Sequence, residues 1–580
     1  VKAYLNFFNV QDGKNAALGA EADSLQRQII RNAGDRPENA LAPSIQLLEG
    51  GFDRNRVMYA LADTLICGRP DTLLLYSTDP EKALYVARFS EVGTGNGDYV
   101  LDRQVGANGP VFRYVPRIDC VPQGNFAPVV QAIPPRQHAM LTSGVVIRLA
   151  GEGEIQTEVA MSYRDLNRLS SLDDGDNTGL AGFTRYRQIF QLGDSAQSWQ
   201  LETQLHYEFV QARFQALNPY RNPEFQRDWN LSRDQLGRIN TSTPTQEQLA
   251  RGGLALIKPG WGKLQYGYGT FLRLGQYTGT QHQTSLDIQR KGFLLQFNGN
   301  LLQTNGNLEQ TNFFRPHLRL EQTFRNLANW KIGAYGEREQ NKRRDAAYLD
   351  TLSGTSFYYD LYRLYMEGPS NKGFSTRFSF QQRQDYLPEQ NSFEPLSRAD
   401  EWNAGGQWSA GKASTLNWDF TYRRLDIQAP ERTNLEPQST YLGRADHQLL
   451  LGRGALRLVS SYELGSGQEP RINFTYLEVN DGQGNYQWKD YNKDGVPQLN
   501  EFEAAVFQDS ANYIRVSQFT DEYLRTNNVQ YNQSLQLEPR AIWYQKKGLK
   551  KMVSRFSSQT SAQVNRKVKV DGAVSPWNPF

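Results

Sequence analysis

One stretch toward the end of the chain has the residue types and the spacing of a calcium-binding loop. It runs from Asp490 to Glu501 and fits the pattern D-x-[DN]-x-[DN]-G-x5-E over its whole length. Ca²⁺ takes about six to eight oxygen ligands, so such a loop supplies oxygens at alternate positions and a closing glutamate, while its glycine permits the sharp turn. The expected ligands are Asp490, Asn492, Asp494, the carbonyl of Val496, Gln498 and Glu501.

The flanks of this loop differ from those of a paired EF-hand. The preceding residues, 478–489, contain Asn480-Asp481-Gly482 and cannot form a good entering helix, whereas residues 501–507 could form a short exiting helix. Pro497 lacks the N–H through which paired loops bond to each other. We therefore expect a solitary loop that binds Ca²⁺ weakly, at about 10⁻⁴ to 10⁻³ M. The alternative is an Asx-rich surface turn that holds no ion.

Other candidate sites are weaker. The run Asp173-Asp174-Gly175-Asp176-Asn177 could bind a cation, but it lies between expected strands, and a solvated hairpin tip is the better interpretation. No Ser/His/Asp or Cys/His constellation can be assembled from neighbouring motifs, so we expect no enzyme activity. Two cysteines and five scattered histidines do not support a zinc site. Cys67 and Cys120 can form a periplasmic disulfide or can equally remain two free thiols.

The elements that carry these residues are expected to be β-strands. From about Met140 onward, apolar or aromatic residues repeatedly occupy every second position, and residues 199–209 are the clearest case. This period of two gives each strand one apolar face and one polar face. A polar inner wall would carry Arg148, Glu158, Glu202, Glu208 and Arg423.

Composition favours a membrane barrel over a soluble all-β protein, which is the open alternative. Of the 580 residues only 38% are hydrophobic, yet 12% are aromatic, which suits a lipid-facing band with aromatic girdles. The mean hydropathy of −0.65 and the lack of an apolar run near 20 residues exclude a helical membrane protein. We therefore predict an all-β chain that forms a large antiparallel transmembrane β-barrel of roughly 16 to 20 strands.

The chain is expected to have two parts. Residues 1–135 read as a small soluble α+β region, with a helix over 16–30, a weaker helix over 56–65 and several short strands. Residues 136–580 read as the barrel, which includes the calcium-type loop at 490–501 and long polar loops such as 218–253. Pro576 and Pro579 would remove two ladder donors, so the last residues are expected to lie outside the sheet or to precede further chain.

Three stretches carry a resemblance to a group of known proteins. They are Tyr220-Arg-Asn-Pro-Glu-Phe-Gln-Arg-Asp-Trp229, Gly95-Asn-Gly-Asp-Tyr99, and the run from Asp490 through Asn500-Glu501-Phe502 to Asp509. In these stretches the chain resembles large outer-membrane proteins of the Bacteroidota, in a sequence style that covers about the last four-fifths of its length. The resemblance implies an outer-membrane location and a large β-barrel, and it transfers no catalytic residue.

The resulting functional hypothesis is a non-enzymatic outer-membrane β-barrel that forms a passage or a scaffold in an envelope transport or secretion assembly. Its expected partners are outer-membrane lipid, other outer-membrane proteins or lipoproteins, and Ca²⁺. With 64 basic and 61 acidic residues the charge is nearly balanced, so we expect no nucleic-acid partner. The alternative is a calcium-stabilised secreted or cell-surface all-β protein, an adhesin or glycan binder whose Tyr and Trp rings stack on sugars.

Overall fold

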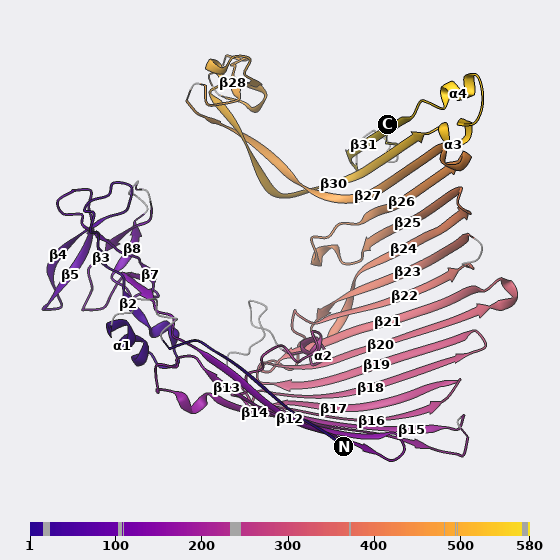
Figure 1. The fold of residues 1–580 in the computed structure, drawn as a ribbon, viewed down its shortest axis with the longest axis horizontal. Coiled ribbons are helices and arrows are strands. Elements are labelled where there is room, and N and C mark those ends of the chain that lie inside the picture. Colours follow the sequence, from indigo (N-terminus) through magenta and orange to yellow (C-terminus); the bar gives the residue numbers. More distant parts are fainter. Residues whose placement is uncertain are drawn as a thin grey trace. The chain divides into compact units, whose positions relative to one another are not determined.

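The structure is a computed structural model. It describes residues 1–14, 24–102, 107, 109–195, 197–231, 245–369, 373–480, 482–493, 495, 497–570 and 578–579. In these residues the chain is mainly β-structure, and 21 strands form one antiparallel sheet in the order β1, then β12 to β31 (Figure 1). The all-β class and the large antiparallel sheet predicted from the sequence are therefore confirmed. No helix in the described part combines the length and the apolar character that a bilayer span requires.

The strands of the large sheet are mostly 10 to 19 residues long. They are β1 (Lys2–Gln11), β12 (Gln137–Leu149), β13 (Gly153–Asp165), β14 (Thr178–Gln191), β15 (Gln200–Val210), β16 (Glu247–Lys258), β17 (Gly262–Arg273), β18 (Tyr277–Arg290), β19 (Phe293–Gly306), β20 (Glu309–Phe324), β21 (Trp330–Asp345), β22 (Phe357–Glu367), β23 (Phe374–Glu389), β24 (Ser392–Ala410), β25 (Ser414–Ile427), β26 (Gln438–Leu451), β27 (Leu456–Glu478), β28 (Tyr486–Trp488), β29 (Phe502–Ala504), β30 (Tyr513–Leu537) and β31 (Ser558–Lys569).

Alternating sequence and tight turns explain why these strands pair with their neighbours in chain order. The segment 199–209, expected to be a strand, forms β15. Between β18 and β19 the turn has only two residues, Lys291 and Gly292, with φ of 49° and 88°. Two consecutive positive φ values give a turn whose twist matches that of the flanking strands, so the chain can fold straight back.

The strand count and the end strands differ from the sequence-based expectation. The sheet has 21 strands, more than the expected number, because β1 and the two short strands β28 and β29 also belong to it. β1 lies within the part expected to be a soluble region, yet it pairs antiparallel with β12. In the described residues β1 and β31 end the strand order and do not pair with each other, so a closed barrel stays a prediction.

Three local predictions were wrong. Residues 218–253 were expected to be one long loop, but β16 begins at Glu247. The alternation in residues 534–544 predicts a strand over that stretch, but β30 ends at Leu537 because Pro539 cannot donate to the ladder, and helix α3 (Arg540–Trp543) follows. Residues 56–65 were expected to be helical but contribute to strand β4 (Tyr59–Ile66).

The chain divides into two compact units. The first comprises residues 1–191, 201–254 and 268–280, and the second residues 192–200, 255–267 and 281–580. We call residues 24–131, which belong to the first unit, the N-terminal region. This region holds helix α1 (Ser24–Asn32), the η1 turn (Pro37–Asn39) and three small sheets. Residues 15–23, which cover part of the expected helix, lie outside the described residues.

The three small sheets of the N-terminal region are built from short strands. They are β2 (Leu41–Pro43) with β11 (Val129–Gln131); β3 (Gln46–Leu47), β6 (Tyr85–Val86), β4 and β5 (Arg69–Tyr76); and β7 (Ser90–Glu91), β10 (Phe126–Ala127), β8 (Tyr99–Asp102) and β9 (Val111–Tyr114).

The N-terminal region has its own hydrophobic core. Tyr59, Leu74, Tyr99 and Phe112 are buried together. The two buried phenols are also hydrogen-bonded, since the N–H of Phe112 donates to the Tyr59 hydroxyl at 3.0 Å and the N–H of Leu74 donates to that of Tyr99 at 2.9 Å. Burial raises the pKa of Tyr59 to about 12.

A disulfide joins two tight turns of this region. Cys67 and Cys120 are bonded, with their Cα atoms 5.7 Å apart, which decides between the two possibilities left open by the sequence. Cys67 lies in the turn between β4 and β5, and Cys120 lies in the turn between the bridged residues Ile118 and Val121. The bond closes a loop with a sequence separation of 53 residues, and it restricts the unfolded chain accordingly.

Candidate functional site

In the second unit, strands β19 to β27 and β30 present two faces of different chemistry. The register aligns one apolar residue after another across the strands: Ile332 pairs with Met366, which pairs with Phe378, which pairs with Ala404, which pairs with Phe420. We call the face that carries this row the banded face, and the opposite face the polar face. Apolar side chains of the banded face are exposed in the described protein, and Leu364 is 62% exposed.

Two rows of aromatic rings bound the apolar zone of the banded face. In the first row, neighbouring rings from four strands lie 5.0 to 5.5 Å apart: Phe380, Trp402, Tyr422 and Tyr441. The second row lies near the opposite strand ends, where Phe324 pairs with Trp330 and Phe374 pairs with Trp408. On β24 the two rows are six residues apart, from Trp402 to Trp408, which is about 20 Å along a strand.

Charged pairs follow directly beyond the first aromatic row on the same face. Arg398 and Asp400 are 3.1 Å apart, Arg424 and Asp426 are 3.1 Å apart, and Arg338 contacts Asp360 at 2.7 Å. Asp400 is two residues before Trp402 on β24, so the change from rings to charges takes one side-chain step on that face. The banded face therefore passes from apolar to aromatic to charged along the strands.

The polar face carries clusters of hydrogen-bonded ionic and hydroxyl groups. The Tyr335 hydroxyl donates a hydrogen bond to Oε2 of Glu337, and the Tyr359 hydroxyl donates one to Oε1 of the same carboxylate. Tyr365 donates to Glu321 at 3.0 Å and accepts from Arg319 at 3.0 Å. Tyr365 can reach over β21 because residue 333 is glycine, and a Cβ there would lie 2.1 Å from the tyrosine ring.

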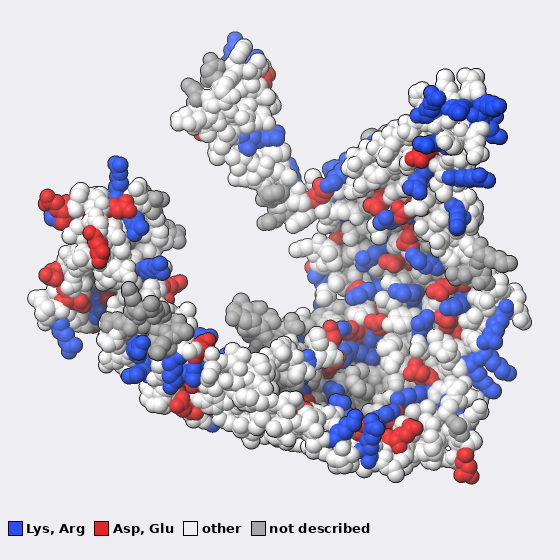
Figure 2. Space-filling view, in the orientation of Figure 1, with Lys and Arg blue, Asp and Glu red and all other residues white. Residues whose placement is uncertain are grey.

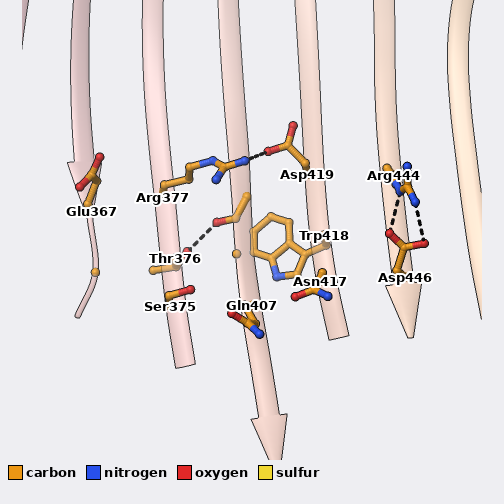
Figure 3. A pocket seen from close by; sticks show the side chains of 13 residues that line it. Glu367, Ser375, Thr376, Arg377, Gln407, Asn417, Trp418, Asp419, Arg444 and Asp446 are labelled. Carbon is orange, nitrogen blue, oxygen red and sulfur yellow. Dashed lines mark hydrogen bonds and ion pairs between the residues drawn. The ribbon is translucent and has the colours of Figure 1, made fainter. Parts of the chain in front are cut away.

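A hollow of about 530 Å³ on the polar side of β22 to β26 shows how the charges are balanced (Figure 3). Arg377 on β23 forms an ion pair with Asp419 on β25 across β24, where Gly405 leaves room for the contact. Arg444 and Asp446 pair at 2.7 Å. The hollow is open and polar, with matched charges, so it can hold water and ions, and its residues suggest no nucleophile and base arrangement.

The inner-wall residues predicted from the sequence each lie beside a polar or charged residue of their own unit. In the first unit Glu158 accepts a hydrogen bond from Tyr4, Glu202 pairs with Arg187, and Glu208 contacts Arg221 at 2.7 Å. Arg148 lies opposite Glu154 in the register of β12 and β13. In the second unit, Arg423 lies between Glu401 and Thr440 in the register, on the polar face.

The calcium-type loop lies at the end of a β-hairpin. Strands β28 and β29 pair antiparallel and place Trp488 opposite Phe502. The expected absence of an entering helix agrees with β28, whereas the expected exiting helix over 501–507 was wrong, because β29 occupies 502–504. The paired ring of Phe502 stacks on Tyr476 of β27, with centroids 4.0 Å apart.

Within the loop, the first and last expected ligands make defined contacts. Asp490 accepts hydrogen bonds from the N–H of Lys493 at 2.6 Å and of Gly495 at 2.9 Å. Glu501 is 1% exposed, and its Oε2 accepts from Trp488 Nε1 at 3.0 Å and from the N–H of Gln498 at 3.2 Å. The N–H of Lys489 donates to the carbonyl of Glu501 at 2.9 Å, so the two ends of the loop lie side by side.

The middle of the loop is described only in part. Asp494 and Val496 lie outside the described residues, and Asn492 is exposed. Among the residues described, no group of three or more Asp, Glu, His or Cys side chains is arranged to hold a metal ion. Calcium binding by this loop therefore stays a prediction.

The second acidic run, 173–177, lies in the first unit beside Asp35. Both line a hollow of about 570 Å³ that also contains Arg36 and Arg164. Partial burial, with the neighbouring carboxylates Asp165 and Asp176, raises the pKa of Asp35 to about 6. Sequence reasoning missed Asp35 because it lies about 140 positions from the acidic run, and nothing local marks it.

The chain matches no protein-family model and no curated protein.

Proposed function

We propose that this chain forms a membrane-spanning β-sheet wall of an outer-membrane barrel and acts as a passage or a scaffold in envelope transport. The observation that carries the proposal is the banded face, where an apolar zone lies between two aromatic rows and charged pairs follow beyond one of them. Membrane barrels have an outward apolar band about 25 Å tall with aromatic girdles at both interfaces, and the spacing of the two rows is close to that value. The polar face would line the lumen.

Two further features support this assignment. An apolar side chain such as Leu364 gains little in water when it remains 62% exposed, but hydrocarbon is a favourable neighbour for it. The disulfide between Cys67 and Cys120 suits an oxidising compartment such as the periplasm or the cell exterior. Outer-membrane lipid would be the main partner, and other outer-membrane proteins or lipoproteins would join the assembly.

Spin labels at two matched positions test the membrane assignment. The two native cysteines are bonded to each other, so a single new cysteine can be labelled in the full chain. Leu364→Cys places a label on the banded face, and Ser379→Cys places one on the polar face of the adjacent strand. In lipid vesicles we expect the first label to be accessible to oxygen and shielded from a water-soluble nickel chelate, and the second to show the reverse. Equal accessibility to the chelate at both sites would rule out a lipid-facing band.

Electrical recording separates the two forms of the proposal. A passage lined by the polar face would give discrete conductance steps in planar bilayers. The ion pair of Arg377 and Asp419 borders the hollow in Figure 3, so Asp419→Asn would shift the selectivity of such steps toward anions. A correctly inserted protein that stays electrically silent would leave the scaffold role and exclude the passage.

We further propose that the loop 490–501 binds one Ca²⁺ weakly and stabilises the hairpin formed by β28 and β29. Asp490 and Glu501 lie at the two ends of the loop, which are side by side, and they are the first and last ligands of the sequence pattern. Calorimetric titration of the full chain with CaCl₂ should show saturable uptake that Asp490→Ala abolishes. Glu503→Gln, which changes a carboxylate outside the pattern, is the matched control, and uptake that is the same in all three proteins would exclude the site.

A further inference from the structure

The connection between β30 and β31 forms a cationic and apolar surface, which we call the basic module (residues 538–557). It contains α3 and α4 (Leu549–Val553). Residues 540–556 include six basic and no acidic side chains. Figure 2 shows Lys and Arg gathered where Figure 1 labels α4. The six basic residues are Arg540, Lys546, Lys547, Lys550, Lys551 and Arg555.

The positive charges of the basic module have no acidic partners within the described protein. None of the six takes part in an ion pair among the described residues, whereas many other arginines of the second unit do. The cations are therefore available to an external anion. Six like charges so close together are unfavourable in isolation, and an anionic partner would relieve their repulsion.

Exposed apolar side chains alternate with these cations. Those of Leu549, Met552 and Phe556 are 76%, 54% and 66% exposed, and Ile542 and Tyr544 are exposed as well. Arg540 lies 5.3 Å from the centre of the Tyr544 ring. A surface that offers both cations and apolar groups matches the headgroup and acyl boundary of a bilayer better than it matches a purely polar ligand.

The basic module is fixed to one edge of the sheet. The N–H of Glu538 donates to the carbonyl of Ala455 at 2.7 Å, and the side chain of Ile542 lies over Gly452. At this edge the other connections of the second unit have two to eight residues, such as Lys291–Gly292 and Gly411–Ala413, whereas the opposite edge carries, beside the two-residue turns 307–308 and 390–391, the longer connections 346–356 and 428–437. Short turns are the periplasmic end of outer-membrane barrels.

The register also sets the level of the basic module relative to the second aromatic row. Trp408 pairs with Leu416, and the row continues through His447 and Ser460 to Gln533 on β30. The basic module begins five residues further along the strand, at Glu538. This places its start about 17 Å along β30 beyond that row, on the side of the short turns.

We propose that the basic module binds the anionic phospholipid headgroups of the leaflet that faces the short-turn edge, and so anchors this edge of the sheet. The proposal rests on the proposed membrane-spanning role and adds a lipid class to it. Every lysine near an anionic surface adds to the attraction, so the loss of two of the six cations should weaken binding by on the order of tenfold.

The test measures lipid binding by the full chain in neutral detergent. Phosphatidylglycerol is titrated, and the bound lipid is counted by native mass spectrometry, with phosphatidylcholine and inorganic phosphate as separate arms. The variant is Lys550→Gln with Lys551→Gln. The control is Lys291→Gln with Lys412→Gln, which removes the same charge from two exposed turns at the same edge.

We expect preferential binding of phosphatidylglycerol, a roughly tenfold weakening in the variant, little change in the control, and strong weakening by salt. No preference over phosphatidylcholine, equal weakening in the control, or equal competition by inorganic phosphate would overturn the proposal. The spin labels at Leu364 and Ser379 report separately on the membrane-spanning role. Lipid binding with a water-exposed banded face would therefore refute only that role, and the converse result would refute only the lipid site.

Discussion

The N-terminal region and the banded face use the same kinds of apolar residue in opposite ways. In the N-terminal region, Tyr59 and Phe112 are 1% and 8% exposed, and protein atoms surround them. On the banded face, Leu364 and Phe378 are 62% and 43% exposed. Residue type therefore does not by itself fix burial. The first region has enough short elements to enclose a core, whereas a single-layer sheet leaves one whole face to its surroundings.

Removal of a core ring gives the largest expected contrast between the two regions. Phe112→Ala removes a ring that stacks on Phe89 with centroids 4.4 Å apart, and it should destabilise the N-terminal region by about 3–5 kcal/mol. Phe378→Ala on the banded face should cost less than about 1 kcal/mol in detergent. Hydrogen exchange of each region in the full chain measures both effects. Similar losses at the two sites would mean that Phe378 is packed against protein.

Loss of the disulfide should affect only the N-terminal region. Cys67→Ser with Cys120→Ser removes the link across 53 residues, and it should cost about 2–4 kcal/mol. Limited proteolysis and hydrogen exchange should then show faster opening of residues 57–115, while the strands of the second unit keep their protection. Equal loosening of both parts would show that they do not unfold independently.

A charge placed on the banded face tests its contact with lipid. Leu364→Arg should oppose insertion into lipid vesicles by about 2–4 kcal/mol, because the guanidinium would lie in the hydrocarbon zone. Ser379→Arg, on the polar face of the neighbouring strand, should change insertion little. Urea-dependent folding into vesicles, followed by the mobility of the folded band on unheated gels, gives both values. Tolerance of Leu364→Arg would remove the distinction between the two faces.

Acidity should stabilise the N-terminal part of the first unit slightly. The pKa of Asp35 is raised to about 6, above its ordinary value of about 3.9, so the folded state holds a proton more tightly than the unfolded state. Stability gained from this proton is complete below about pH 4 and lost as the pH rises through about 6. Asp35→Asn should flatten this dependence, by on the order of 1 kcal/mol. Thermal unfolding of both proteins at pH 4.5 and pH 7.5 provides the measurement.

The sequence predicted the strands best where the alternation was strict. The alternating segment 199–209 is the clearest case, and β15 spans Gln200–Val210. The prediction failed where local preference and pairing disagreed. Lys2–Gln11 forms a strand because it pairs along ten residues of β12. Residues 56–65, expected to be a helix, contribute instead to β4, because this strand pairs with β5. β12 lies more than 120 positions from β1 in the sequence, so no local pattern predicts that pairing, whereas β5 follows β4 directly after the turn at Cys67 and Gly68.

For the calcium-type loop, too, some features follow from the local sequence and others from strand pairing. Spacing alone predicts a calcium-type loop from Asp490 to Glu501, and the composition of residues 478–489 predicts that no helix enters it. Neither indicated that Glu501 would be buried and bonded to Trp488. That contact depends on the pairing of β28 with β29, which spacing does not encode.

The amino-acid sequence by itself determined that the chain is all-β, that most strands have one apolar and one polar side, and where the tight turns fall. These follow from a two-residue period and from turn chemistry, both of which are local. Only the tertiary structure decided that Cys67 bonds Cys120, that rings from four strands line up in one row, and that Arg377 meets Asp419 over Gly405. Each of these depends on the register between strands, which side chains from separate parts of the chain set together.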